Sequence, residues 1–382
     1  MADFPLCTAF TGLLMLATAP TALANDDITA KFSGRLYYEF AHFDNDTRGP
    51  AERSGDDLRA AWLGVAGKVH SVGYKLEADF AGHRPVARDV YLTHKIGTAL
   101  LTVGQFKQFY TLDDRSSANH TPTIERSFLV QSLGTAYRLG IGAQGNHAGI
   151  FWSGSVFSLE SIDVWQAKGH VIGGRVGHAP WQQPGHVLHF GVSGAHEHHS
   201  HPGADGALPL RAQARTTGHY GDNGRLPLVD FRSGRAVSVN RYSVETAGVS
   251  GPWSWQAEYG GARYDDGQQR GEVQAGYLQG SWLLTGETRP YDPRGGRFIQ
   301  LEPEGDIGAW ELVARYDRIN GRQWPAQQRD VTAEAWTLGV NWYASSKVRL
   351  MLDWTDSRRR DELRGQTLDH TGVLAGRAQL HF

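Results

Sequence analysis

Apolar and polar residues alternate from Lys31 to the end of the chain, and turns rich in Gly, Asp and Pro interrupt the alternation. A period of two places successive side chains on opposite faces of a β-strand. The clearest apolar faces comprise Phe32, Gly34, Leu36, Tyr38 and Phe40; Val72, Tyr74, Leu76, Ala78 and Phe80; Trp253, Trp255, Ala257 and Tyr259; Trp310, Leu312, Ala314 and Tyr316; Trp336, Leu338, Val340 and Trp342; and Val348, Leu350, Leu352 and Trp354. Helical periodicity is almost absent, so the pattern predicts an all-β chain.

The last predicted strand, residues 373–382, ends on the terminal residue Phe382. Soluble domains usually finish in a frayed polar tail, so a strand at the very end of the chain is informative. Taken alone, this strand favours an ordinary half-buried strand of a soluble sheet over a strand of a membrane barrel. The rest of the chain reverses that preference.

The polar faces of the predicted strands repeatedly carry charged residues, among them Arg35, Glu77, Glu258, Arg315 and Asp353. The packed core of a β-sandwich accepts such charges only when they are paired, whereas a water-filled lumen accepts them freely. Trp and Tyr also cluster near strand ends, as in the girdles at membrane interfaces. We therefore predict a transmembrane antiparallel β-barrel.

Long polar segments separate the strands at 43–56, 105–130, 196–235 and 292–306. Long loops that alternate with short turns are typical of a barrel whose loops share the extracellular rim. No apolar run after the N-terminal segment approaches the ~20 residues of a transmembrane helix. A barrel does not need one, because its strands satisfy each other's backbone groups.

The N-terminus has the features of a secretory signal peptide, which we expect over residues 1–24. An uncharged, largely apolar stretch from Thr8 to Ala22 precedes an A-x-A cleavage site at 22–24, and the barrel domain is expected over 25–382. No Lys or Arg precedes the apolar stretch, which departs from the usual signal. The single cysteine, Cys7, precedes this stretch, so the mature chain lacks disulfides.

The formal net charge is −2, from 38 Lys and Arg against 40 Asp and Glu, and this balance does not point to nucleic acid. Arg outnumbers Lys by 31 to 7. Arg makes two-pronged contacts with phosphate and carboxylate, although a GC-rich genome accounts for most such excesses.

Two further features of the sequence bear on metal binding and catalysis. His196, His198, His199 and His201 invite a metal interpretation, but their spacing is not the zinc-protease pattern, and a solvated tract at the rim is the better interpretation. No nucleophile elbow, phosphate-binding glycine loop or dinucleotide fingerprint is present, so we predict neither catalysis, nor a metal, nor a cofactor.

Several motifs in one order resemble the phosphate-selective porins of the Gram-negative outer membrane, the porin O and porin P group. These motifs are LLTGETRPY at 283–291 with Gly296 and Phe298; GAWELVARY at 308–316; LGVNWY at 338–343; RAQLHF at 377–382; GRL at 34–36 with Phe43 and Asp44; and GQFKQ at 104–108 with ERS at 125–127. The LLTGETRPY block is the strongest of them. The resemblance implies a barrel of sixteen strands, an assembly of three barrels, and a segment after Gln105 that folds inward as a constriction loop.

The resemblance also implies which basic residues line the pore. Arg35, Arg59 and Arg126 match basic pore positions of the family, and Lys107 and Arg115 lie in the expected constriction segment. Further arginines on inward faces are Arg175, Arg241, Arg315, Arg349 and Arg377, and each is interpreted with equal weight as pore-lining or as paired with a neighbouring carboxylate such as Asp79, Asp89, Glu245 or Glu311. Rings of Arg or Lys select anions through charge-assisted hydrogen bonds.

Two departures weaken the expected phosphate site. The chain has Ser116-Ser117-Ala118-Asn119-His120 where the family carries a constriction lysine, and Ala60 where a second arginine is expected beside Arg59. His120 would add positive charge only at lower pH.

The sequence therefore predicts a passive, anion-selective channel of the phosphate type in the outer membrane of a Gram-negative bacterium. Its expected partners are small anions such as phosphate, outer-membrane lipid and lipopolysaccharide, and two further copies in a homotrimer. The alternatives are a general or organic-acid porin without phosphate preference and, less favoured, a barrel enzyme or adhesion protein.

Overall fold

The computed structural model describes residues 23–25, 28–204, 207–220, 225–326 and 328–382; the expected signal peptide lies outside these residues except for Leu23 and Ala24. Its main sheet has seventeen antiparallel strands. They are β1 (Leu23–Asn25), β2 (Ile28–Asp44), β3 (Gly55–Val69), β4 (Val72–Asp79), β5 (Val86–Ile96), β6 (Ala99–Lys107), β7 (Tyr137–His147), β8 (Ile150–Ser158), β9 (Gly169–Gln183), β10 (His186–His199), β13 (Val237–Ser250), β14 (Trp253–Asp265), β15 (Arg270–Leu283), β18 (Ala309–Trp324), β19 (Arg329–Tyr343), β20 (Val348–Asp361) and β21 (Gln366–His381).

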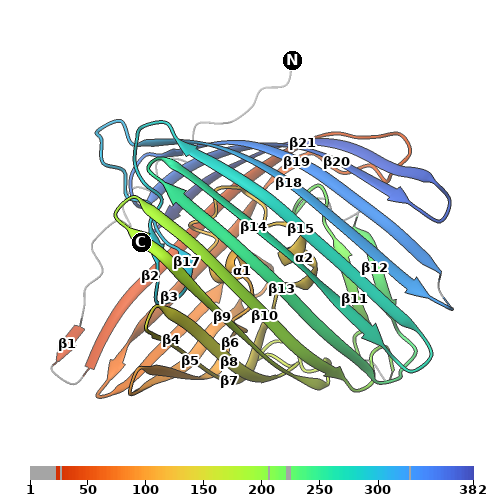
Figure 1. Cartoon of the computed structure of the whole chain (residues 1–382), viewed down its shortest axis with the longest axis horizontal. Coiled ribbons are helices and arrows are strands. Elements are labelled where there is room, and N and C mark those ends of the chain that lie inside the picture. The colour runs from red at the N-terminus through yellow and green to blue at the C-terminus, as the bar shows by residue number, and fades with distance from the viewer. Residues whose placement is uncertain (1–22, 26–27, 205–206, 221–224, 327) are drawn as a thin grey trace.

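Sixteen of these strands, all except the short β1, close into a ring (Figure 1). Strands adjacent in the chain pair throughout, with β10 beside β13 and β15 beside β18. The ring closes where β21 pairs with β2, in a register that places Ala378 opposite Tyr38. Closure removes the free edges of the sheet. The predicted sixteen-stranded antiparallel barrel is thus confirmed.

The two rims of the barrel differ. Two-residue turns at 70–71, 97–98, 148–149, 184–185 and 251–252 lie at one end, the turn rim, where β21 also finishes. In one of these turns both residues have positive φ, 50° at Ala148 and 80° at Gly149, the conformation that matches the twist of a tight hairpin. The opposite end, the loop rim, carries the loops that follow β2, β4, β6, β8, β10, β14, β18 and β20.

One prediction about the loops was wrong. The predicted segments 43–56, 105–130 and 196–235 overlap connections at the loop rim, but 292–306 lies within the connection 284–308 at the turn rim. The reason is strand direction: β15 runs from the loop rim back to the turn rim, so its following segment emerges beside the chain terminus.

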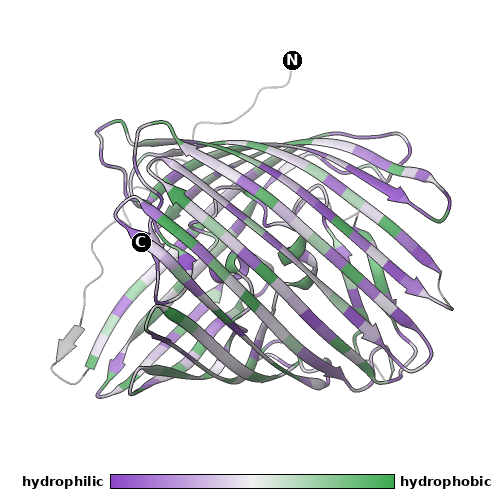
Figure 2. Ribbon diagram, viewed as in Figure 1, coloured by the Kyte–Doolittle hydropathy of each residue, from purple (hydrophilic) through white to green (hydrophobic). Residues whose placement is uncertain are grey.

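The predicted apolar faces point outward. Figure 2 shows hydrophobic and hydrophilic residues alternating along the strands. Phe40 and Leu338 are 44% and 50% exposed, whereas the positions on either side of each, Glu39 and Ala41 and residues 337 and 339, are buried. Outward aromatic pairs stack near the turn rim, at 4.7 Å between the ring centroids of Trp253 and Trp282. This outer surface suits hydrocarbon bordered by aromatic residues.

The lumen is largely filled by three chain segments. The inner loop, residues 108–136, contains the short helices α1 (Leu112–Arg115) and α2 (Phe128–Leu133), which Figure 1 shows inside the ring. The loop-rim connection 200–236 contributes β11 (Leu210–Ala214) and β12 (Leu226–Phe231), and the turn-rim connection contributes β16 (Tyr291–Asp292) and β17 (Arg297–Phe298). Among the described residues, no helix has the length and apolar character needed to cross a membrane.

An apolar core inside the barrel holds part of this filling in place. Phe128 and Leu129 of α2 pack with Leu228 of β12 against wall residues of β13 to β19. The inward constriction loop predicted after Gln105 is therefore confirmed, and it lies against one side of the lumen. A cavity remains on the other side, next to β2–β7.

Candidate functional site

A cavity of about 1030 Å³ lies between the inner loop and the wall formed by β2–β7. Twelve basic residues of the described chain border it, against six acidic ones. The basic residues are Arg35, Arg59, Lys75, Arg88, Lys107, Arg115, Arg126, Arg211, Arg215, Arg225, Arg297 and Arg377. The acidic residues are Glu77, Asp79, Asp89, Asp114, Glu125 and Asp163. The cavity therefore has a positive balance although the whole chain has a formal charge of −2.

Arg35 enters the cavity from β2, where the alternation of the strand turns it inward. Arg59 enters from β3 at a β-bulge, where the register with β2 shifts, so that Arg59 and Ala60 both border the cavity. The Arg35 guanidinium lies 3.9 Å from the centroid of the Trp62 ring, a cation–π contact that holds it against the wall. Among the described residues, no carboxylate oxygen lies within 4.0 Å of the guanidinium nitrogens of Arg35, Arg59 or Arg115. These three cations are the ones best placed to meet a solute anion.

Lys107 is the last residue of β6, and Arg115 is the last residue of α1 in the inner loop. Lys107 pairs with Asp114 at 3.0 Å, so its charge is partly neutralised. Arg115 donates from Nη2 to Oε1 of Gln144 at 3.0 Å and stacks 4.3 Å from the Phe109 ring centroid. Burial, reinforced by the nearby arginines 297 and 175, lowers the pKa of Arg115 to about 9. The guanidinium still remains charged at neutral pH.

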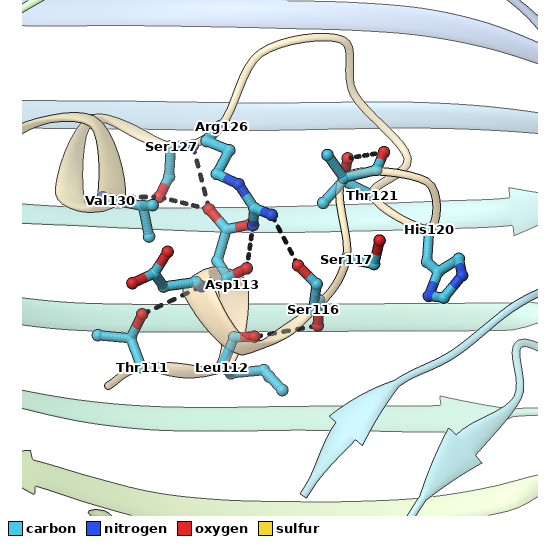
Figure 3. Close-up of polar contacts among 12 residues, drawn as sticks. Thr111, Leu112, Asp113, Ser116, Ser117, His120, Thr121, Arg126, Ser127 and Val130 are labelled. Atoms are coloured by element: carbon cyan, nitrogen blue, oxygen red, sulfur yellow. Dashed lines mark hydrogen bonds and ion pairs between the residues drawn. The ribbon is translucent and has the colours of Figure 1, made fainter. Parts of the chain in front are cut away.

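Arg126 ties the inner loop together, as Figure 3 shows. Its Nη1 lies 2.9 Å from Oδ1 of Asp113, and its Nη2 donates to the backbone oxygen of Ser116 at 2.6 Å. Ser127 Oγ donates to Oδ2 of the same Asp113 at 2.9 Å. Burial opposes the charged form, but Asp113 and Asp114 raise the pKa of Arg126. Arg126 thus borders the cavity while it also fixes the shape of the loop.

Arg315 and Arg377 are placed differently from the other candidates. Arg377 borders the cavity but is only 6% exposed, and its Nη2 lies 2.5 Å from Oε1 of Glu39. Arg315 is not among the residues that border the large cavity; its Nε lies 2.6 Å from Oδ2 of Asp317. Their guanidinium groups also donate to inner-loop carbonyls, Arg377 to Ile124 and Arg315 to Glu125, both at 2.8 Å. Both arginines hold the inner loop against the wall.

The other inward arginines contact the filling segments. Arg175 pairs with Glu245 at 2.6 Å and Arg241 pairs with Glu197 at 2.5 Å. For these two arginines, the structure shows pairing with a neighbouring carboxylate, one of the two interpretations that the sequence left open. Arg349 donates to the backbone oxygen of Thr121 at 2.9 Å. These arginines stabilise the packed side of the lumen.

Three wall carboxylates hold the inner loop by its backbone, a role that the strand pattern did not predict although it placed Glu258 and Asp353 on inward faces. Glu258 accepts from the N–H groups of Leu112 and Asp113, at 3.0 and 2.7 Å. Asp317 accepts from Phe128 N–H at 2.9 Å, and Asp353 accepts from Ile124 N–H at 2.7 Å. The sequence feature that could have indicated this role is an inward acidic residue on each of three strands, in a lumen expected to be basic.

The turn-rim connection 284–308 was also missed as part of the lumen. Arg289, within the strongest motif, pairs with Glu311, and its Nη1 donates to the backbone oxygen of His120 at 3.3 Å. Arg175 donates to the carbonyls of Gly295 and Gly296 at 3.1 and 2.6 Å. The LLTGETRPY motif therefore anchors this connection beneath the inner loop.

The predicted acid-dependent charge on His120 finds no support. Burial, together with Arg349 and His381, lowers the pKa of His120 to about 3. Of the four histidines at 196–201, the first three form the loop-rim end of β10 and the last follows it in the connection, with His196 Nδ1 2.9 Å from Oδ1 of Asn240. Within the described ranges, no cluster of three or more His, Cys, Asp or Glu is arranged to hold a metal.

A closed barrel with an apolar outer surface, aromatic pairs and a charged, loop-constricted lumen has the architecture of an outer-membrane porin. The family model described as "Phosphate-selective porin O and P" matches residues 31–382. The chain belongs to this family.

Individual relatives are more distant. Porin O of Pseudomonas aeruginosa is 25% identical over 362 residues, which cover 86% of this chain and 83% of that protein. An uncharacterized protein of Caulobacter vibrioides is 27% identical over 401 residues, 96% of this chain and 78% of that protein. Among solved structures, OmpT expressed in the outer membrane of Vibrio cholerae has a TM-score of 0.62 at 13% identity, over 94% of this chain and all of that chain. The anion-selective porin from Comamonas acidovorans has a TM-score of 0.60 at 13% identity, over 93% of this chain and all of that one.

Proposed function

We propose that the protein is a passive, anion-selective channel whose permeation path is the arginine-rich cavity beside the inner loop. The observation that carries this proposal is the twofold excess of basic over acidic residues along the cavity, with Arg35, Arg59 and Arg115 free of carboxylate partners among the described residues. Anions would exchange part of their hydration for charge-assisted hydrogen bonds at successive guanidinium groups. Each site must bind weakly enough to release the anion to the next.

The proposal includes the setting of the channel. The loop rim faces the outside of a Gram-negative cell, since barrels carry their long loops there. Three copies form the assembly, as the family resemblance implies, and lipid and lipopolysaccharide surround it. Transport requires no cofactor and no bond is made or broken, so the protein is not an enzyme.

Phosphate is the proposed preferred anion, and a planar bilayer measurement tests this. The purified protein is inserted, and the reversal potential is measured in a KCl gradient and again after phosphate is added. We expect a potential of the sign set by chloride and a chloride current that phosphate reduces. A cation-selective channel would overturn the proposal.

A second candidate is a channel for organic acids without phosphate preference. The observation that favours it is the aromatic lining of the cavity, formed by Trp62, Tyr91, Phe106, Phe109 and Tyr137. Aromatic faces favour the apolar part of an organic anion and contribute little to inorganic phosphate. The same bilayer distinguishes the two: chloride current that is indifferent to phosphate but reduced by benzoate would favour the second candidate.

A further inference from the structure

The outer surface of the barrel carries a charged belt at the loop rim of β18–β20. Arg318 and Arg322 of β18 and Arg358 and Arg360 of β20 are all exposed. Arg318 pairs with Glu334 of β19 at 2.8 Å, and Arg322 pairs with Asp330 at 3.0 Å. In Figure 2, the ends of these strands that lie far from the C-terminus are largely hydrophilic.

Three of these arginines form a triangle. In the strand register, Arg318 lies opposite Glu334, and Glu334 lies opposite Arg358. Arg318 and Arg358 are therefore two strand spacings apart, about 10 Å, and Arg360 lies about 7 Å further along β20 on the same face. Arg358 forms no ion pair with any of the residues that the structure describes.

The height of the triangle on the barrel is set by aromatic residues directly below it. Tyr316 lies two residues before Arg318 on β18, and Trp336 lies two residues after Glu334 on β19. Their ring centroids are 4.9 Å apart. Trp354 of β20 is 45% exposed on the same side. Aromatic girdles lie at the level of lipid headgroups, so the arginines stand at or just beyond that level.

The belt lies on one arc of the circumference, which continues onto β14 and β15 with the exposed Arg263 and Arg270. Near the loop rim of β8–β10, the described outward positions carry no arginine: Val156 and Ile172 are 51% and 55% exposed, and the others include His170, His196 and His198. Strands β4–β8 are also short, at 8 to 11 residues, whereas β18–β21 have 14 to 16. A general solubility requirement at the rim would not concentrate arginine on a single arc of long strands.

We propose that Arg318, Arg358 and Arg360 bind the phosphate groups of lipid A, the phosphorylated glycolipid of the outer leaflet. This inference rests on the proposed function in one respect, that the barrel lies in the outer membrane with its loop rim facing the outside of the cell. Guanidinium groups bind phosphate through two parallel, charge-assisted hydrogen bonds. Exposed ion pairs such as Arg318–Glu334 contribute little because water screens them, so a phosphate dianion can recruit Arg318 from its carboxylate.

The test titrates the full-length protein in detergent with bisphosphorylated lipid A and counts bound lipid by native mass spectrometry. The triple variant Arg318→Gln, Arg358→Gln, Arg360→Gln is expected to bind about tenfold more weakly than the unmodified protein, since three charge-assisted contacts are lost. The matched control is Arg48→Gln, Arg53→Gln, Arg84→Gln, three loop-rim arginines above β2–β5, with no change expected.

A second variant has the opposite expected sign. Glu334→Gln removes the carboxylate next to Arg318 and Arg358 and should tighten lipid A binding. Lipid A stripped of both phosphates should bind the unmodified protein and the triple variant equally weakly. The proposal is overturned if the triple variant binds as tightly as the unmodified protein, if the control loses as much, or if removal of the phosphates has no effect.

The two proposals can fail separately. The triple variant changes no cavity residue, so its conductance and reversal potential should equal those of the unmodified protein. A protein that binds lipid A through the triangle but conducts no ions would overturn the channel and leave the lipid site standing. If the protein conducts anions and the triple variant binds lipid A as tightly as the unmodified protein, the lipid site is overturned and the channel stands.

Discussion

Individual arginines in this lumen differ in whether their guanidinium group is paired with a carboxylate or faces the cavity without one. Arg315 and Arg377 form ion pairs with Asp317 and Glu39, and they also donate hydrogen bonds to inner-loop carbonyls. Arg35 and Arg59 border the cavity without such a carboxylate in the described chain. Counting inward arginines therefore overstates the charge that a permeating anion meets. The useful quantity is the number of cavity guanidinium groups without a carboxylate partner.

Replacement of Arg59 by glutamine should lower anion selectivity. A unit charge about 7 Å from a permeating ion contributes about 1 kcal/mol in a partly aqueous cavity, and its loss disfavours anions and favours cations by that amount each, so the anion-to-cation permeability ratio should fall about thirtyfold. The reversal potential in a KCl gradient measures this ratio. Arg53→Gln, on an exposed rim loop, is the control and should leave the ratio unchanged; an unchanged ratio in Arg59→Gln would show that Arg59 does not act on the path.

Selectivity should also be constant between pH 5 and 8. The described residues that border the cavity include no histidine, and His120 has a pKa of about 3, so it stays neutral throughout this range. Protonation of His120 would become appreciable only as the pH falls toward 3, well below the interval tested. Reversal potentials recorded at half-unit steps check this, with His120→Gln as the comparison. A step near pH 6 that His120→Gln abolishes would contradict it.

At the scale of elements, carboxylates of the strands hold the inner loop by its backbone. Glu258, Asp317 and Asp353 each accept loop N–H groups that would otherwise be buried without a partner. A buried donor that loses its partner costs more than the bond itself is worth, because the donor is also removed from water. The inner loop is therefore held in the lumen by the wall as well as by contacts within the loop.

Replacement of Asp353 by alanine tests this arrangement. The Ile124 N–H loses its acceptor, and we expect a loss of about 1–3 kcal/mol in the free energy that holds the loop down. The measurable results are faster protease cleavage within 117–125 and larger fluctuations of the single-channel current. Asp353→Asn keeps an acceptor oxygen and should show a smaller effect. Equal cleavage rates in all three proteins would mean that Asp353 does not restrain the loop.

The sequence predicted the local features of these elements far better than their long-range contacts. Alternation identified the outward faces, since the side-chain period of a strand is local, and the family resemblance supplied the strand number and the inner loop. The pairing of Arg377 with Glu39 joins residues 338 positions apart, and Asp353 meets Ile124 across 229 positions. No local pattern encodes such contacts. The segment 292–306 was assigned to the wrong rim because strand direction depends on every preceding strand.

For the whole molecule, the seam that closes the ring extends from Asp44 and Gly372 to the terminal Phe382. Phe382 and Gly34 exchange backbone hydrogen bonds, with N–O distances of 3.0 Å from Gly34 N to Phe382 O and 3.1 Å in return. The Phe382 ring also covers Gly34, where an added Cβ would come within 2.5 Å of the ring. The terminal aromatic residue therefore completes the seam between the first and last barrel strands.

Deletion of Phe382 should weaken that seam more than Phe382→Ala does. The deletion removes both closing hydrogen bonds and the ring, a loss of about 1–3 kcal/mol from the hydrogen bonds alone, whereas the alanine variant keeps the backbone pairing. Urea unfolding of the refolded protein, followed by tryptophan fluorescence, measures the difference. Phe382→Tyr keeps the ring and the hydrogen bonds and should match the unmodified protein. If Phe382→Ala is as unstable as the deletion, the aromatic ring over Gly34 secures the seam and the hydrogen bonds add little.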